Sequence, residues 1–179
     1  MASRVNFKFE GEELKGIKNL KENLAKMANL QARIGLFGGN YPGTGESIAS
    51  VGMLHEFGSQ HERKFTYKGQ QVKISGVPQR SFLRVPIRAK KNKIMMGRKF
   101  FKAYIAVALA DNKPEKPLKL LALNAWSIVQ EAFATRGFGQ WQPNMNKEYI
   151  KLKGSTTPLI DTGLLKNSVA YKVVKRGAD

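Results

Sequence analysis

Hydrophobic and polar residues alternate in four stretches of the chain, and this two-residue period is typical of β-strands. The stretches are residues 5–9, 31–37, 149–152 and 169–174. Two further stretches, residues 63–68 and 71–77, flank a turn near Lys68-Gly69 and predict a basic β-hairpin. The pattern therefore predicts strands near both ends of the sequence and a hairpin between them.

Apolar residues recur every three or four positions in four other stretches, as they do on the buried face of a helix. These predicted helices cover residues 11–29, 47–58, 86–110 and 116–136. In the second helix the apolar stripe consists of Ile48, Val51, Leu54 and Phe57. Gly58 follows at the position where a helix often ends in the left-handed conformation, which favours glycine.

The helix predicted at residues 86–110 begins with Pro86 in its first turn, where a missing N–H is harmless. Gly97 is a weak point inside this helix and is a candidate position for a kink or break. The predicted core face consists of Ile87, Ile94, Phe101, Ile105 and Leu109. In the helix at residues 116–136 the predicted core positions are Leu120, Leu123, Ile128 and Phe133, with Trp126 in the core or at a subunit interface.

The last third of the chain contains a loop and a short helix. The loop at residues 137–143 carries Phe138 and Trp141, two aromatic residues that we expect to be exposed. Asp161 or Thr162 is expected to cap the short helix by accepting hydrogen bonds from its free backbone N–H groups, with Gly163 in the first turn.

Together these elements predict one α+β domain over residues 1–179, with a mostly antiparallel sheet packed against two or more long helices. The length and the hydrophobic content of 42% allow a single domain with a sizeable core. The basic hairpin, residues 61–77, is expected to protrude from this domain.

Positive charge is concentrated in one part of the sequence. The net charge is +18, and residues 61–102 carry thirteen Lys or Arg against a single acidic residue. Such a block attracts polyanions, either DNA or an acidic protein surface, although a solvated cationic surface is an open alternative. The cations expected to contact an anionic partner are Arg63, Lys64, Lys68, Lys73, Arg84, Arg88, Lys91, Arg98 and Lys102. Non-specific nucleic-acid binding by residues 61–102 is therefore a candidate function.

The residues offer no catalytic, cofactor-binding or metal-binding constellation, and we predict a protein that is not an enzyme. Cysteine is absent, and the only histidines, His55 and His61, do not have the spacing of a helical ligand pair. The glycine-rich loop at residues 38–45 lacks the Lys-Ser/Thr pair that holds terminal phosphates and magnesium. The most apolar window, residues 104–110, is far shorter than the ~20 residues of a membrane span, so no membrane partner is expected.

Three motifs in a fixed order carry a family resemblance. They are residues 54–59 (LHEFGS), 77–84 (VPQRSFLR) and 159–168 (LIDTGLLKNS), and residues 32–36 (ARIGL) precede them. This ordered set resembles the phage virion morphogenesis family, which comprises tail-completion and head–tail joining proteins of tailed bacteriophages. The residues that match its pattern are His55, Glu56, Phe57, Gly58, Pro78, Arg80, Phe82, Leu83, Asp161, Thr162, Gly163, Leu164 and Ser168.

The resemblance implies a structural, non-enzymatic subunit in the neck or upper tail of a virion, assembled in the host cytoplasm. Such a subunit forms a homo-oligomeric ring, a hexamer or a dodecamer, between the head connector or adaptor and the tail tube or tail terminator proteins. The basic segment would then face an anionic neighbour, either the packaged DNA that passes through the ring or an acidic rim on an adjoining ring.

Overall fold

The computed structural model describes residues 11–42, 45–91, 98–109 and 113–177 of the chain. In these ranges the helices are α1 (Gly11–Ala28), α2 (Ile48–Phe57), α3 (Arg84–Ala89), α5 (Arg98–Leu109), α6 (Glu115–Ala134), α7 (Lys147–Lys153) and α8 (Leu164–Ser168). The strands are β1 (Leu30–Leu36), β2 (Arg63–Tyr67), β3 (Gln70–Ile74) and β4 (Val169–Lys175). The α+β class is confirmed, whereas the strand predicted at residues 5–9 lies outside the described residues.

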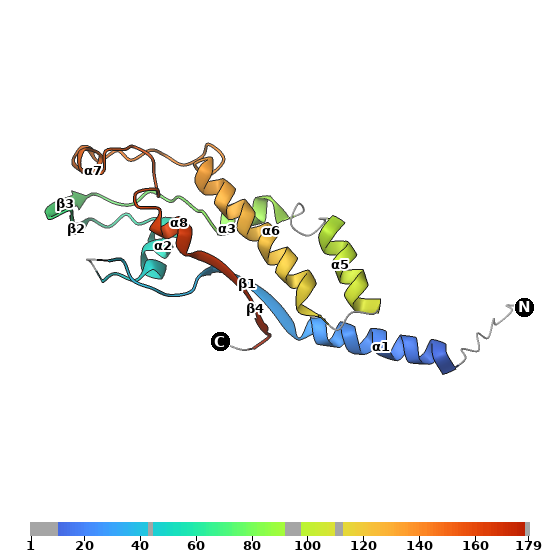
Figure 1. Cartoon of the computed structure of the whole chain (residues 1–179). Coiled ribbons are helices and arrows are strands. Elements are labelled where there is room, and N and C mark those ends of the chain that lie inside the picture. The colour runs from blue at the N-terminus through green and yellow to red at the C-terminus, as the bar shows by residue number, and fades with distance from the viewer. Residues whose placement is uncertain (1–10, 43–44, 92–97, 110–112, 178–179) are drawn as a thin grey trace, which may run out of the picture.

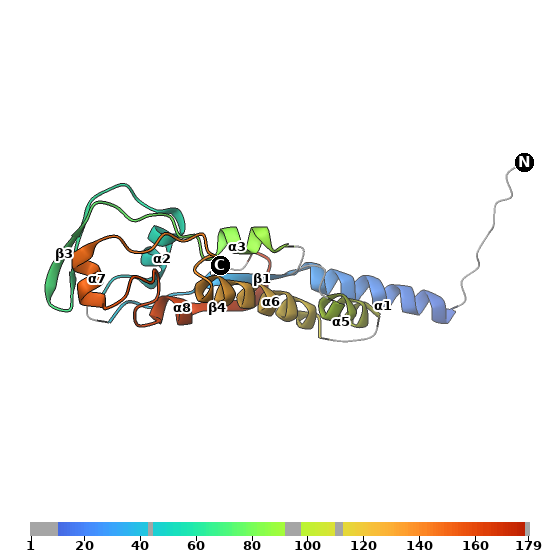
Figure 2. The same ribbon diagram turned by 90° about the horizontal axis from the view of Figure 1, so that it is seen from above.

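The described strands form two separate two-stranded antiparallel sheets instead of one larger sheet. The first sheet pairs β1 with β4 from Leu36 opposite Val169 to Leu30 opposite Lys175. The second sheet is the hairpin of β2 and β3. Figures 1 and 2 show an elongated molecule, in which the hairpin and α7 lie at one end and α1 and α5 lie towards the other.

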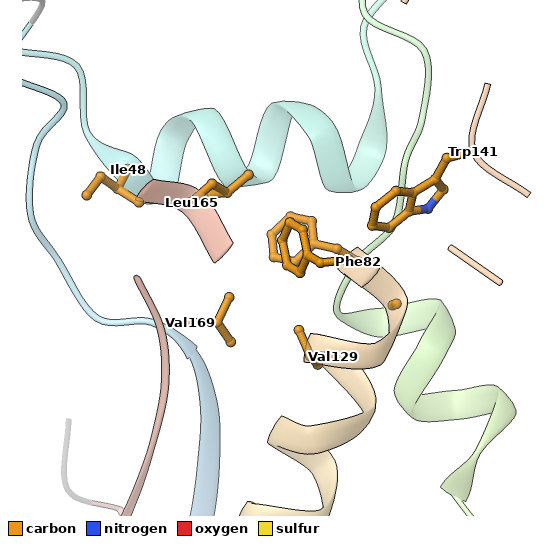
Figure 3. Packing of buried hydrophobic residues seen from close by; sticks show 8 residues of the cluster. Ile48, Phe82, Val129, Trp141, Leu165 and Val169 are labelled. Carbon is orange, nitrogen blue, oxygen red and sulfur yellow. The ribbon is translucent and has the colours of Figure 1, made fainter. Parts of the chain in front are cut away.

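The main core lies where α2, α6, α8 and the sheet of β1 and β4 meet around Phe82 (Figure 3). The Phe82 ring is 5.2 Å from that of Phe133, and the Phe133 ring is 5.7 Å from that of Trp141. Trp141 is only 9% exposed, so the prediction that it is a surface residue is wrong. Its loop folds back against α6. The indole N–H donates a hydrogen bond to the carbonyl oxygen of Ser81, which lies just before α3. Phe138 is half-buried against the same core.

The apolar stripe predicted for α2 coincides only in part with its buried face: Ile48 is buried and Val51 and Leu54 are half-buried, but Phe57 is not. The buried residues are Ile48, Gly52 and Glu56, whereas Phe57 is 57% exposed. Gly52 allows the close approach, because a Cβ there would lie 2.2 Å from Leu36 Cδ1. The helix therefore packs through Ile48, as predicted, and also through Gly52 and a hydrogen-bonded carboxylate, which a rule based on hydrophobicity does not identify.

The single helix predicted at residues 86–110 is interrupted. Helix α3 ends at Ala89, and the next residue, Lys90, leaves the helical conformation with φ −107° and ψ 14°. The candidate break at Gly97 lies outside the described residues. Among the α5 side chains that the structure describes, Ala103, Val107 and Ala108 are buried, and Val107 and Ala108 pack with Met27 of α1. Of the predicted core face, Ile87 packs against the main core and Ile105 and Leu109 are exposed, whereas the side chains of Ile94 and Phe101 lie outside the described residues.

Helix α6 largely agrees with its prediction. Ile128 and Phe133 are buried as expected, whereas Leu123 is exposed. Trp126 is half-buried, and its indole N–H donates to the carbonyl oxygen of Val169 at 2.9 Å. None of the helices in the described ranges has the length and apolar character needed to cross a membrane.

The stretch predicted as a strand at residues 149–152 belongs to helix α7 instead. The side chain of Asn146 caps this helix, since its Oδ1 accepts a hydrogen bond from Tyr149 N at 2.8 Å. Gly154 ends the helix in the left-handed conformation, with φ 76° and ψ 12°. Four alternating residues are too few to distinguish a strand from one turn of an amphipathic helix.

Helix α8 is not capped in the predicted way. Its N-cap is Gly163, with φ 77° and no side-chain cap, so Gly163 precedes the first turn. Asp161 instead accepts a hydrogen bond from the Tyr67 hydroxyl at 2.7 Å. Thr162 Oγ1 accepts from the N–H of Leu164, the first residue of the helix, at 3.3 Å, so Thr162 does bond to one free N–H group although it is not the N-cap.

Candidate functional site

The carboxylate of Glu56, at the end of α2, organises the segment that leads into α3. It is buried and accepts hydrogen bonds from Ser81 Oγ at 2.5 Å and from the backbone N–H groups of Phe82, Leu83 and Arg84 at 2.9–3.0 Å. Ser81 Oγ in turn accepts from Val85 N at 3.0 Å. The start of α3 thus receives acceptors from Ser81 and from Glu56, which lies 28 positions before Arg84 in the chain.

Arg80 connects the same segment to the loop after α6. This buried guanidinium donates from Nε to Gln142 O at 3.0 Å and from Nη2 to Pro143 O at 3.1 Å. The backbone N–H of Arg80 donates to His55 O at 2.8 Å. Arg80 therefore joins the end of α2, through its backbone, to a loop more than 60 residues further along the chain, through its side chain.

Gly58 turns the chain away from α2 under tight packing. Its φ is 75° and its ψ is 174°, so φ is positive as predicted, but the residue lies outside the left-handed helical region. A Cβ at this position would lie 2.9 Å from Gln79 N and 3.1 Å from Val77 O. The exposed Pro78 lies between these two residues, and Ser59 forms a two-hydrogen-bond bridge with Val77.

The third motif packs against the same core as the first two motifs. Leu165 of α8 is buried beside Gly52 and belongs to the same core cluster as Phe82. Leu164 packs against this cluster, and its carbonyl oxygen accepts from Ser168 Oγ at 2.7 Å. The three motifs therefore form one structural junction, the motif junction, which consists of residues 55–58, 78–84 and 161–168. Phe57 is the motif residue whose large apolar side chain is exposed.

Three aromatic residues, Phe65, Tyr67 and Tyr149, connect the hairpin to α7 beside this junction. The Tyr149 ring of α7 lies 5.9 Å from the Phe65 ring and 5.3 Å from the Tyr67 ring. Burial raises the pKa of Tyr149 to about 12, with a further contribution from the charge of Asp161. Burial and the hydrogen bond to Asp161 also raise the pKa of Tyr67. Both phenols stay protonated at neutral pH and can donate hydrogen bonds.

His55 occupies a cationic part of the junction. Its Nδ1 atom is buried and has no hydrogen-bond partner in the described part of the chain. Burial, together with the positive charges of Arg80 and Lys153, lowers the pKa of His55 from 6.5 to about 4. The imidazole is therefore neutral in the folded protein at physiological pH.

We expect acid to destabilise the protein through His55. Because its pKa is lower in the folded state, the unfolded chain binds the proton more readily, and the stabilisation present above pH 6.5 is lost as pH falls towards 4. The difference in the His55 pKa between the folded and unfolded states corresponds to about 3 kcal/mol of the free energy of unfolding. Urea unfolding at pH 7 and pH 4.5 checks this: His55→Gln should reduce the pH dependence, and the exposed-site control His61→Gln should retain it. Equal pH dependence in all three proteins would contradict the assignment.

The predicted partner-contacting cations do not gather on one surface. Lys64 and Lys73 lie opposite each other on the hairpin, exposed on the face away from Val72, and Lys73 pairs with Glu62 at 2.8 Å. Lys68 contacts the protein itself, because its Nζ donates to Leu152 O at 2.9 Å. Arg63 is exposed at the start of β2.

The remaining cations lie on and after α3. The Arg84 guanidinium stacks over the exposed Phe57 ring at 4.9 Å and lies 3.7 Å from the Glu56 carboxylate. Arg88, Lys91 and Lys102 are exposed, whereas Arg98 begins α5 and its side chain lies outside the described residues. The basic block of the sequence is thus distributed along the length of the molecule (Figure 1).

We also searched for metal-binding clusters and for similar proteins. In the ranges that the structure describes, no three His, Asp or Glu side chains gather in a way that could hold a metal ion. A comparison with protein-family models, curated proteins and solved structures gives no match.

Proposed function

We propose that this chain is a structural protein of the neck or upper tail of a tailed bacteriophage, where it completes the tail and joins it to the head. In this role it assembles into a ring of six or twelve copies in the virion. It docks to the head connector or adaptor and to tail tube or tail terminator proteins without catalytic turnover.

The convergence of the three ordered motifs carries this proposal. Residues that are up to 110 positions apart in the sequence meet in the motif junction, where Glu56, Arg80 and Leu165 make buried contacts. Such a junction gives a rigid body, which an assembly subunit needs in order to present fixed surfaces to its neighbours. Phe57 and Met53, which are 57% and 64% exposed on the outer face of α2, offer apolar contacts of the kind used between proteins.

The charge distribution supports docking to a different, anionic molecule. Glu56, Glu62, Glu115 and Asp161 already have partners within the chain. Few described carboxylates are thus available to neutralise the exposed cations of a neighbouring copy. Contacts between copies would then rest on apolar and backbone groups, and the cations would face DNA or an acidic protein.

The mass of the purified protein in solution, measured by light scattering with and without connector and tail proteins, tests the proposal. We expect six or twelve copies, formed alone or induced by a partner. A monomer at every concentration that also ignores these partners and is absent from purified virions would exclude the ring.

Non-specific nucleic-acid binding is a second candidate function, and the exposed cations Lys64, Arg88 and Lys91 favour it. Contact with phosphates should weaken linearly on a log–log plot against salt concentration. A monomer that binds DNA with a steep salt slope would support this alternative, and a flat response would remove it.

A further inference from the structure

Strand β1 has an open edge. At the end of the ladder of β1 and β4, Arg176 N donates to Asn29 O at 2.7 Å, so these two residues form a hydrogen-bonded pair. Hydrogen-bonded and non-hydrogen-bonded pairs alternate along an antiparallel ladder, so every second residue of β1 after Asn29 bonds to β4 and the residues between them do not. The backbone groups that point away from β4 are therefore those of Leu30, Ala32, Ile34 and Leu36. In the described part of the chain no other strand pairs with this edge. An unpaired edge of this kind is a template for an added strand.

An apolar groove lies beside this edge, between β1, α3 and α6. Its volume is about 200 Å³, and its apolar lining consists of Ala32, Ile34, Ile87, Leu121, Ala122 and Ala125. Half of these residues are alanines, which leave room for large incoming side chains. An open strand edge beside an apolar groove fits an extended segment that adds to the sheet and inserts alternate side chains.

We propose that residues 5–9 of a second copy of this chain occupy this groove as an added strand. Val5, Phe7 and Phe9 alternate with Asn6 and Lys8, so the three apolar side chains project to one side of an extended segment. Two phenylalanines would fill the space over the alanines, while Lys8 points away from the groove border, where Lys91 lies.

The occupant comes from another copy because of the length of α1. This helix has 18 residues and is about 27 Å long. Gly11 is at the start of this helix, and β1 begins after its last residue and extends further away from Gly11 (Figures 1 and 2). Phe9 lies two residues before Gly11 and therefore within about 7 Å of it. Residues 5–9 cannot reach the β1 edge of their own chain.

When each copy donates its N-terminal segment to β1 of the next copy and does not receive one back from it, the contact is head-to-tail and closes into a ring or continues as a filament. The inference deepens the proposed function and rests on it for the assembly, but the groove can be tested without any assembly.

The first experiment uses the full chain carrying Phe7→Asp, whose own segment should leave the groove empty. A synthetic peptide of residues 1–10 should bind it and slow hydrogen exchange of the Ala32 and Ile34 amides at least tenfold, because these N–H groups point into the groove. A Phe7→Asp peptide should bind at least tenfold more weakly. An Asn6→Asp peptide, which places the same charge on the opposite side, should bind like the wild-type sequence.

Absence of peptide binding, or binding without protection of β1, would overturn the inference. So would equal affinity of the Phe7→Asp and Asn6→Asp peptides.

The second experiment compares the masses of full chains in solution. Phe7→Asp should dissociate the assembly and Asn6→Asp should preserve it, with circular dichroism confirming that both variants fold. If the wild-type ring forms and Phe7→Asp leaves it intact, the inference fails while the proposed function stands. If the wild-type chain never assembles, alone or with connector and tail proteins, and is absent from purified virions, the proposed function fails, and the peptide experiment alone decides whether the groove accepts this segment.

Discussion

Replacing Glu56 by alanine should lower the free energy of unfolding by about 3–5 kcal/mol, the usual cost of removing one partner of a buried charged network. The substitution leaves the Ser81 hydroxyl and the N–H groups of Phe82, Leu83 and Arg84 without their acceptor. It also removes the link between α2 and α3, so the loss should spread through the motif junction. Urea unfolding at neutral pH measures the change.

Two further variants separate the role of Glu56 from a general effect of losing a charge. Glu56→Gln keeps the shape and one acceptor oxygen but turns an amide towards backbone donors, so we expect an intermediate loss of about 2 kcal/mol. Glu62→Ala removes an exposed partner of Lys73 and should cost less than about 1 kcal/mol. If Glu56→Ala resembled Glu62→Ala, the carboxylate would not be holding the junction together.

The period of the hydrophobic pattern correctly located those helices and strands whose formation depends mainly on their own local sequence. The helices α1 and α6 and the strands β1, β2, β3 and β4 lie within a few residues of their predicted bounds, because each carries a sustained apolar pattern or a turn signal. The hairpin turn is an example: Lys68 and Gly69 both have positive φ, at 48° and 77°, as a two-residue hairpin turn requires.

The motif junction could not be derived from such patterns, because its contacts join distant parts of the chain. Glu56 looks like a solvated helix residue until the amides of residues 82–84 are placed beside it. Trp141 looks exposed in a glycine-rich loop until the loop folds onto Phe133. The resemblance did mark Glu56, Gly58, Arg80 and Phe82 as a set, and the structure brings these four residues together.

The same limit explains the errors in helix faces. A stripe of large apolar residues predicts the buried side only when the neighbouring element accepts large side chains. Helix α5 meets α1 through Val107 and Ala108, and α2 meets β1 through Gly52, so these close contacts use residues smaller than leucine or phenylalanine. The larger residues Leu109 and Phe57 are then left on the outside, 65% and 57% exposed.

Gly58→Ala should destabilise the protein by about 3 kcal/mol, because two penalties coincide at this residue. A φ of 75° with a ψ of 174° belongs to a region that is essentially restricted to glycine. In addition, the new methyl group would lie 2.9 Å from Gln79 N and 3.1 Å from Val77 O, which are backbone atoms that cannot rotate away. Relief would require the bridge between Ser59 and Val77 to open.

Gly16→Ala provides a matched control with the opposite expected sign. Gly16 is exposed inside α1, and a Cβ added there would meet nothing within 4 Å, so alanine should stabilise the helix by about 0.5–1 kcal/mol. Thermal unfolding of the two variants beside the wild type measures both effects with the same chemical change. A stable Gly58→Ala protein would mean that the chain leaves α2 by another path. The contacts of Glu56 and Arg80 depend on where that path leads residues 77–84, so the geometry of the junction would then have to differ as well.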